Sequence, residues 1–119
     1  MIPVGVSPDR FVLPENEIIE NCKSGIEIKC PYTLANHIRT FDTNSIPDEY
    51  LLQIDAQIYA CDFDYIDFVS YHPLLTATGF EYIEIRRERT PARMQHIENI
   101  TGRFIDRIIN LEKKLRCVL

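Results

Sequence analysis

The chain has 119 residues, of which 45% are hydrophobic and 26% are charged. This length and this balance predict a single globular domain with a core of its own, and they argue against a disordered chain. No stretch of the sequence is long and apolar enough to cross a membrane.

The net charge of −5 is unevenly distributed along the chain. Residues 1–83 hold four basic and 13 acidic residues, whereas residues 84–119 hold nine basic and five acidic residues. A basic C-terminal third can lie along a phosphate backbone while divalent cations offset the acidic part. A solvated basic helix explains the same charges equally well.

The cysteines and the N-terminal residues indicate the cellular compartment. The four cysteines are Cys22, Cys30, Cys61 and Cys117. They form no C-x-x-C pair and have no close histidines, so reduced structural thiols are expected rather than disulfides or zinc ligands. The first six residues lack the basic and long apolar segments of a secretory signal, which predicts a cytoplasmic protein.

The first 25 residues predict a turn followed by a β-hairpin. Ser-Pro-Asp-Arg separates two short apolar runs and places Asp9 near a strand junction. An Asx-turn or a cap is the structural alternative for this aspartate. Residues 18–22 have the pattern of a strand, and residues 23–25 the pattern of a tight turn into the next strand.

The segment 25–31, Gly-Ile-Glu-Ile-Lys-Cys-Pro, combines a strand pattern with an acid and a base. Successive side chains of a strand point to opposite faces, so Glu27 and Lys29 share one face. Ile26, Ile28 and Cys30 share the other face, which we expect to pack into the core. Pro31 ends the strand because it cannot donate to the ladder.

Two helices are predicted next. Residues 32–41 form a short amphipathic helix with Thr33 as N-cap, based on apolar residues at Leu34, Ile38 and Phe41. His37 and Arg39 lie on this helix; His37 is expected to face solvent, with a phosphate contact as the alternative. The second helix begins near Pro47. Its expected buried stripe consists of Leu51, Ile54, Ile58 and Cys61, and a neighbouring face carries Tyr50, Gln53 and Gln57.

The remaining segments predict two strands and a long helix. Residues 65–71 and 80–85 have strand patterns. Arginines follow the second of these strands: Arg86, Arg87, Arg89 and Arg93. Such a cluster can clamp phosphates or can balance the nearby glutamates. From about Ala92 an apolar stripe continues to Val118, which predicts a long helix packed on the sheet, with a coiled-coil contact as the alternative.

Four linked motifs carry a resemblance to a known family. They are Ser7-Pro8-Asp9, then Glu27-Ile28-Lys29-Cys30-Pro31, then Ile46-Pro47 with Tyr50 and Gln53, and finally the segment Asp67–Pro73. In this order they resemble the YqaJ-like viral recombinases, the lambda-exonuclease-type members of the PD-(D/E)xK nucleases. The resemblance runs from about Val4 to Pro73, and four motifs in order are much more specific than a lone Glu-x-Lys.

The resemblance implies an α/β fold for residues 1–119: a restriction-endonuclease-like mixed β-sheet flanked by helices, with a long C-terminal helix. It implies an Mg²⁺-dependent exonuclease, with Mn²⁺ as a substitute metal. Asp9, Glu27 and the Ile28 carbonyl would ligate the metal. Lys29 would orient or deprotonate the attacking water, and Gln53 would lie beside the metal.

The resemblance also implies partners. The expected substrate is the end of double-stranded DNA, degraded from the 5′ end in phage-type recombination. The expected protein partners are a single-strand annealing protein and further copies of this chain. The residues expected to contact DNA are Arg86, Arg87, Arg89, His37 and Arg39.

The sequence departs from the family at two points. Arg10 follows Asp9 where the family usually has glycine, and the chain lacks the helical region that usually precedes the Ser-Pro-Asp motif. An alternative function is therefore a truncated, non-catalytic nuclease-like domain that binds DNA or a partner protein. A generic soluble α/β protein with an accidental Glu-x-Lys is the third interpretation.

Overall fold

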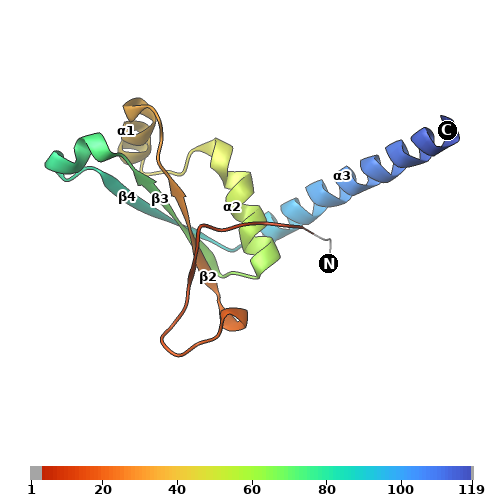
Figure 1. Cartoon of the computed structure of the whole chain (residues 1–119), viewed down its shortest axis with the longest axis horizontal. Helices are drawn as coiled ribbons and strands as arrows, with labels where there is room; N and C mark the ends of the chain where they lie inside the picture. The colour runs from red at the N-terminus through yellow and green to blue at the C-terminus, as the bar shows by residue number, and fades with distance from the viewer. Residues whose placement is uncertain (1–3, 119) are drawn as a thin grey trace.

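A computed structural model describes residues 4–118 (Figure 1). In chain order the elements are β1 (Arg10–Val12), the 3₁₀ helix η1 (Ile19–Asn21), β2 (Ser24–Lys29), α1 (Leu34–Thr43), α2 (Asp48–Cys61), β3 (Tyr65–Tyr71), the 3₁₀ helix η2 (Pro73–Thr78), β4 (Tyr82–Glu88) and α3 (Pro91–Val118). The predicted fold class, a mixed sheet flanked by helices with a long C-terminal helix, is confirmed. Among the described residues, no helix has both the length and the apolar character needed to span a membrane.

The four strands form one sheet in the order β1-β2-β3-β4. The central pair β2 and β3 is parallel, and both outer pairs are antiparallel. Parallel neighbours need a crossover connection, and α1 and α2 supply it. Hydrogen bonds join both helices to the same face of the sheet: His37 of α1 to Ser70, and Gln57 of α2 to Glu27.

The predicted hairpin between residues 18–22 and the Glu27 strand is wrong. The antiparallel partner of β2 is β1, with Arg10 opposite Ile26, while residues 19–21 form a 3₁₀ helix. Ile18 and Ile19 are 61% and 54% exposed, so this segment gains no apolar burial that would hold it in a strand.

The predicted core face of β2 is also wrong. Glu27 is only 3% exposed, whereas Ile28 is 40% exposed and Cys30 is exposed. The crossover helices cover the face that carries Glu27 and Lys29. An acid can be buried there because polar side chains of α2 hydrogen-bond to it.

The core lies between α2 and the sheet. Ile54 and Ile58 of α2 are fully buried and pack with Ile66 and Phe68 of β3. Leu51 and Cys61 pack at the edge of the same cluster. The stripe predicted for this helix is therefore confirmed.

Helix α1 buries only part of the predicted apolar face: Leu34 and Phe41 are half-buried, and the fully buried residues are polar. His37 and Thr40 are buried, whereas Ile38 is 48% exposed. Thr33 occupies the N-cap position as expected, but its side chain makes no capping hydrogen bond. Both polar residues can be buried because each finds hydrogen-bond partners: Ser70 and the Phe80 carbonyl for His37, and the Asn36 carbonyl for Thr40.

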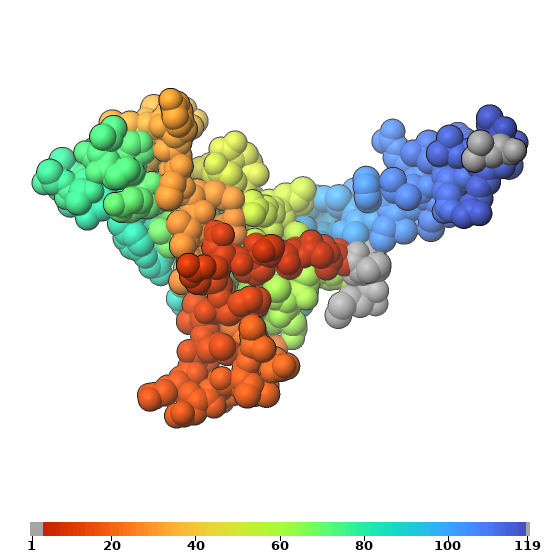
Figure 2. All heavy atoms as spheres, in the orientation of Figure 1, coloured from red at the N-terminus to blue at the C-terminus, as the bar shows by residue number. Residues whose placement is uncertain are grey.

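Helix α3 does not pack on the sheet along its length, contrary to the prediction. Its first turns contact α2 and bury Met94 and Ile97. Beyond them the helix projects away from the body, as the blue segment of Figures 1 and 2 shows, and Phe104 and Leu115 are 62% and 65% exposed. The apolar stripe predicted the helix correctly. It did not show that, among the described residues, other elements pack only against the first turns of this helix.

Candidate active site

The Glu27 carboxylate is the centre of a polar cluster between β2 and α2. Lys29 Nζ and Gln53 Nε2 donate to Glu27 Oε1 at 2.7 and 2.8 Å. Gln57 Nε2 donates to Glu27 Oε2 at 2.9 Å. Both oxygens of this buried acid therefore accept hydrogen bonds, which offsets the loss of hydration that burial would otherwise impose.

The Lys29 ammonium is the second part of the cluster. It also donates to Gln53 Oε1 at 3.2 Å and lies 4.9 Å from the centre of the Tyr50 ring, a cation–π contact. The Tyr50 ring stacks on Phe68, with ring centres 5.7 Å apart. The side chain of Lys29 keeps 24% of its surface exposed, so its amine stays accessible from solvent.

Asp9 lies at the edge of the cluster, just before β1. Its Oδ2 accepts a hydrogen bond from the backbone N–H of Ile28 at 2.7 Å. The register that pairs Arg10 with Ile26 places Asp9 beside Glu27 on the neighbouring strand. Within one strand residue the N–H and C=O point to the same side, so the Ile28 carbonyl also points toward Asp9.

The oxygen donors near this part of β2 are the carboxylates of Asp9 and Glu27 and, on the same side of the strand as Asp9, the Ile28 carbonyl. Mg²⁺ commonly takes one or two carboxylates and completes its shell with water and phosphate oxygens. The donors present fit such an ion. In residues 4–118 there is no group of three or more His, Cys, Asp and Glu side chains that could hold a metal, so a metal here would depend on the backbone carbonyl and on non-protein ligands.

The structure brings together Glu27, Lys29 and Gln53, with Asp9 adjacent, as the sequence predicted. It adds two residues that were not assigned to the site, Tyr50 and Gln57. Gln57 lies four residues after Gln53 on α2, so both amides point to the same strand. This spacing of four residues was the feature of the sequence that could have assigned Gln57 to the site.

The predicted group of arginines does not form one cluster: Arg86 and Arg87 lie within β4, and Arg89 follows it. Arg86 lies on the face opposite the helices, where it makes two hydrogen bonds to Asp67 at 2.8 and 2.9 Å. The central carbon of its guanidinium lies 3.6 Å from the centre of the Tyr65 ring, a cation–π contact. The hydrogen bond to Asp67 raises the pKa of the Arg86 guanidinium above its usual value.

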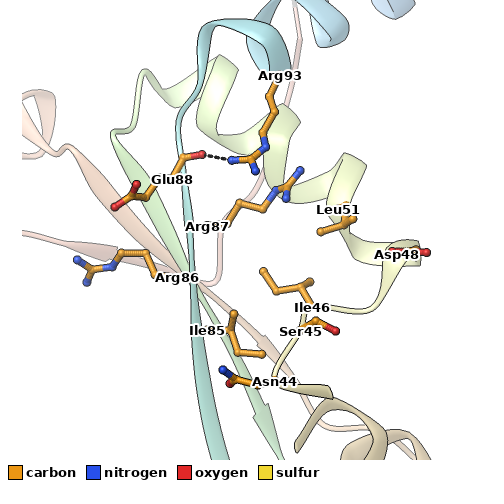
Figure 3. A pocket seen from close by; sticks show the side chains of 10 residues that line it. All are labelled: Asn44, Ser45, Ile46, Asp48, Leu51, Ile85, Arg86, Arg87, Glu88 and Arg93. Atoms are coloured by element: carbon orange, nitrogen blue, oxygen red, sulfur yellow. Dashed lines mark hydrogen bonds between the residues drawn. The ribbon is translucent and has the colours of Figure 1, made fainter. Parts of the chain in front are cut away.

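Arg87 points the other way, beneath α2. It makes two hydrogen bonds to Asp55, both at 2.7 Å, and its side chain is 16% exposed. Figure 3 shows Arg87 beside a surface hollow between β4, α3 and the residues that lead into α2. Arg93 reaches into the same hollow and donates to the Glu88 carbonyl at 2.7 Å.

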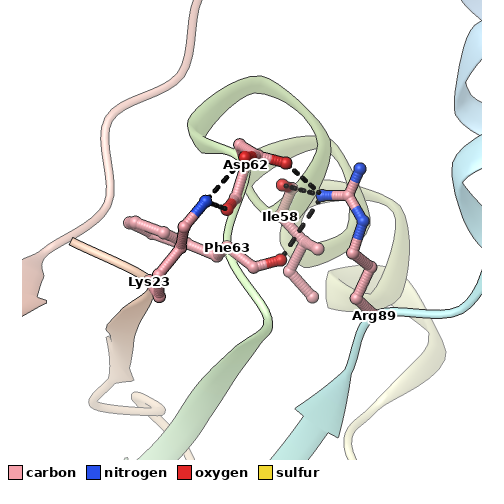
Figure 4. Close-up of polar contacts among 5 residues, drawn as sticks. All are labelled: Lys23, Ile58, Asp62, Phe63 and Arg89. Carbon is pink, nitrogen blue, oxygen red and sulfur yellow. Dashed lines mark hydrogen bonds and ion pairs between the residues drawn. The ribbon is translucent and has the colours of Figure 1, made fainter. Parts of the chain in front are cut away.

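Arg89 lies in a third environment, at the C-terminal end of α2 (Figure 4). It donates to the Ile58 and Phe63 carbonyls at 3.3 and 3.4 Å and pairs with Asp62 at 3.2 Å. Asp62 also pairs with Lys23. The three arginines thus each have local acidic or carbonyl partners, and DNA contact by Arg86, Arg87 and Arg89 stays a prediction.

His37 is fully buried, so the expectation that it faces solvent is wrong. Its Nδ1 lies 2.8 Å from Ser70 Oγ and its Nε2 lies 2.8 Å from the Phe80 carbonyl. Because a carbonyl can only accept, Nε2 carries the proton. With both nitrogens bonded inside the fold, this ring is not available to a phosphate here. Arg39 is exposed on the same helix, and its contact with DNA stays a prediction.

Comparison with known proteins finds similarity to a recombinase domain family and to a nuclease of known structure. The family model for the YqaJ-like viral recombinase domain matches residues 3–64. Two solved structures of an alkaline exonuclease, LHK-Exo from Laribacter hongkongensis, one of them in complex with dAMP, each align with a TM-score of 0.69 and 32% sequence identity. The alignment covers 82% of this chain and 51% of the exonuclease, so the chain spans about half the length of that protein. Comparison with curated protein sequences gives no match.

Proposed function

Because the chain belongs to the YqaJ-like viral recombinase domain family, we propose that it is a metal-dependent nuclease acting on the ends of linear duplex DNA. The observation that carries this proposal is the cluster of Glu27, Lys29 and Gln53 beside Asp9, at one edge of β2. Two acids and a carbonyl can bind a divalent metal ion, and a partly exposed amine can orient a water molecule for attack on a phosphodiester.

The proposed reaction is in-line attack of a water molecule on phosphorus. Asp9, Glu27 and the Ile28 carbonyl would hold Mg²⁺ or Mn²⁺, and the bound ion supplies positive charge that stabilises the transition state. The Lys29 ammonium donates hydrogen bonds at the same place, so it can orient the water and stabilise charge that grows on the phosphoryl oxygens. Gln53 donates to Glu27 and accepts from Lys29, which links the two side chains while no metal is bound.

The more specific parts of the proposal come from the relatives. LHK-Exo is described as an alkaline exonuclease and in complex with dAMP, a nucleotide with the chemistry of a product of DNA hydrolysis. Cleavage from the 5′ end, a role in phage-type recombination in the host cytoplasm, pairing with a single-strand annealing protein and assembly of several copies are proposed for this chain on the family relationship.

A second candidate is a nuclease-like domain that binds DNA or a partner without cleaving. The observation in its favour is that the chain spans about half the length of LHK-Exo. The presence of both acids, the lysine and the glutamine in one cluster favours the catalytic proposal.

End-labelled linear duplex DNA tests the proposal directly. The purified chain is incubated with the DNA and with Mg²⁺, Mn²⁺ or EDTA, beside Glu27→Ala and Lys29→Ala. Glu20→Ala and Lys113→Ala, which change exposed residues away from the cluster, are the matched controls. Label placed at the 5′ or 3′ end identifies the end that is attacked.

The catalytic proposal expects metal-dependent loss of label that both site variants abolish and both controls retain. Cleavage that persists in Glu27→Ala would contradict the assigned site. If the chain binds the DNA but leaves it uncleaved under all metal conditions, the result would favour the binding function instead.

A further inference from the structure

The two oxygens of the Glu27 carboxylate have different sets of partners. Oε1 accepts from Lys29 and Gln53, at 2.7 and 2.8 Å. Oε2 accepts from Gln57 at 2.9 Å. The carboxylate is therefore held from two sides by donors that come from separate positions of β2 and α2.

These donors differ in burial. Gln57 is 2% exposed, whereas Gln53 is an exposed residue and the Lys29 side chain is 24% exposed. A donor at the surface can leave its acceptor and bond to water, while a donor packed inside the fold has no such substitute. We therefore expect the contact to Oε2 to persist and the contacts to Oε1 to exchange with water.

The orientation of the Gln57 amide depends on Glu27. A carboxylate only accepts hydrogen bonds, so the amide must turn its Nε2 toward the acid. Its Oε1 then points away and has no hydrogen-bond partner among the described residues. Within residues 4–118, the bond to Glu27 is the one side-chain hydrogen bond of Gln57 that fixes which way its amide faces.

We propose that Gln57 is a positioning residue: it fixes Oε2 of Glu27 so that Oε1 is presented to the metal, which replaces contacts from Lys29 and Gln53. The part of this inference that concerns metal rests on the proposed function. The part that concerns the metal-free protein does not.

Nuclear magnetic resonance of the metal-free chain tests the hydrogen bond itself. The side-chain amide protons of Gln57 should exchange with solvent far more slowly than those of Gln53. Glu27→Ala should shift the Gln57 amide signals and speed their exchange. Ile54→Val removes a methyl group from the core of the same helix and no hydrogen-bonding group, so the slow exchange of the Gln57 amide protons should persist in it.

Metal titration followed by thermal unfolding tests the consequence, because a ligand that binds the native state stabilises it by mass action. Gln57→Met keeps the approximate length of the side chain and removes the donor. It should raise the Mg²⁺ or Mn²⁺ concentration needed for half-maximal stabilisation by roughly 10–100-fold, the range for residues that orient metal ligands. Gln53→Met should raise this metal concentration less. Ile54→Val should lower the unfolding temperature and leave the metal concentration for half-maximal stabilisation unchanged.

The two measurements separate the possible failures. Unchanged Gln57 signals in Glu27→Ala, or a Gln57→Met titration that matches the unsubstituted chain, overturns the positioning role. Equal losses in Gln53→Met and Gln57→Met overturn the distinction between the two oxygens. If the unsubstituted chain does not respond to metal, the proposed function fails, and the amide signals still decide whether Gln57 holds Glu27.

Discussion

Helix α2 covers two acid–base pairs that are built differently. Lys29 makes one contact to Glu27, and that acid is shared with two glutamine amides. Arg87 makes two parallel contacts to Asp55, with both side chains largely buried. The first pair has donors that can leave, as a site that exchanges ligands requires. The second pair is closed and links α2 to β4, so buried charge alone does not identify a catalytic residue.

The largest expected effect is on catalysis, at the open pair. Lys29→Ala should reduce cleavage of linear duplex DNA by roughly 10²–10⁴-fold, the range for a group that assists proton transfer. Metal-dependent stabilisation should persist, because the oxygen donors remain. Single-turnover cleavage rates and thermal unfolding with and without Mg²⁺ measure the two quantities. Full activity in this variant would remove Lys29 from the mechanism.

The next effect is on stability, at the closed pair. Asp55→Ala should lower the free energy of unfolding by about 3–5 kcal/mol, because it leaves the buried Arg87 charge without its partner. Urea denaturation measures this loss. Asp106→Ala, which removes an exposed acid from α3, is the matched control and should stay within about 0.5 kcal/mol of the unsubstituted chain. If Asp55→Ala lowers the free energy of unfolding no more than Asp106→Ala does, the Asp55–Arg87 pair does not stabilise the fold.

A conservative change sharpens the same point. Arg87→Lys keeps the charge but cannot reproduce the two parallel hydrogen bonds to Asp55. Loss of one charge-assisted hydrogen bond predicts a decrease of roughly 1.5–3 kcal/mol in the free energy of unfolding, smaller than for Asp55→Ala. Urea denaturation of the two variants side by side checks the order, and a reversed order would contradict the geometry described.

The smallest effect is expected at a third pair, on the surface. The hydrogen bond from Lys23 lowers the pKa of Asp62 below its ordinary value of 3.8. Its stabilising contribution is therefore complete above that value and is lost as the pH falls through the lower folded-state value. Because 69% of the Asp62 side chain is exposed, solvent and salt screen the pair.

Asp62→Asn should consequently lower the unfolding temperature slightly at neutral pH and low salt. The difference should vanish in strong acid, where the carboxyl is protonated in both states, and should shrink in high salt. Thermal unfolding across this pH range checks the sign. A difference that grows on acidification would contradict the assigned pairing.

The elements predicted well are those that local pattern specifies. Residues 65–71 form β3 as expected, and the stripe of α2 faces the core, because apolar spacing alone determines these features. The packing of β2 could not be read locally. Its buried face is polar, and its stabilising partners, Gln53 and Gln57, lie more than 20 residues further along the chain.

The same reason explains the outcome at the site. Glu27, Lys29 and Gln53 could be grouped in advance from the motifs they share with a known family. Gln57 carried no motif, and only its spacing from Gln53 indicated a place beside the acid. His37 shows the converse: it was expected at the surface, but Ser70 and the Phe80 carbonyl, both distant in sequence, provide the bonds that bury it.

The projecting half of α3 gives the molecule two levels of local stability. The helix has 28 residues, about 42 Å in length, but the described residues bury only its first turns. Helical turns without tertiary contacts open and close readily. Backbone amides beyond Thr101 should therefore lose their hydrogens to heavy water by local fraying, whereas those of β3 should wait for global unfolding. Hydrogen exchange on the intact chain can thus report the stability of the sheet that carries Glu27 separately from that of the outer helix.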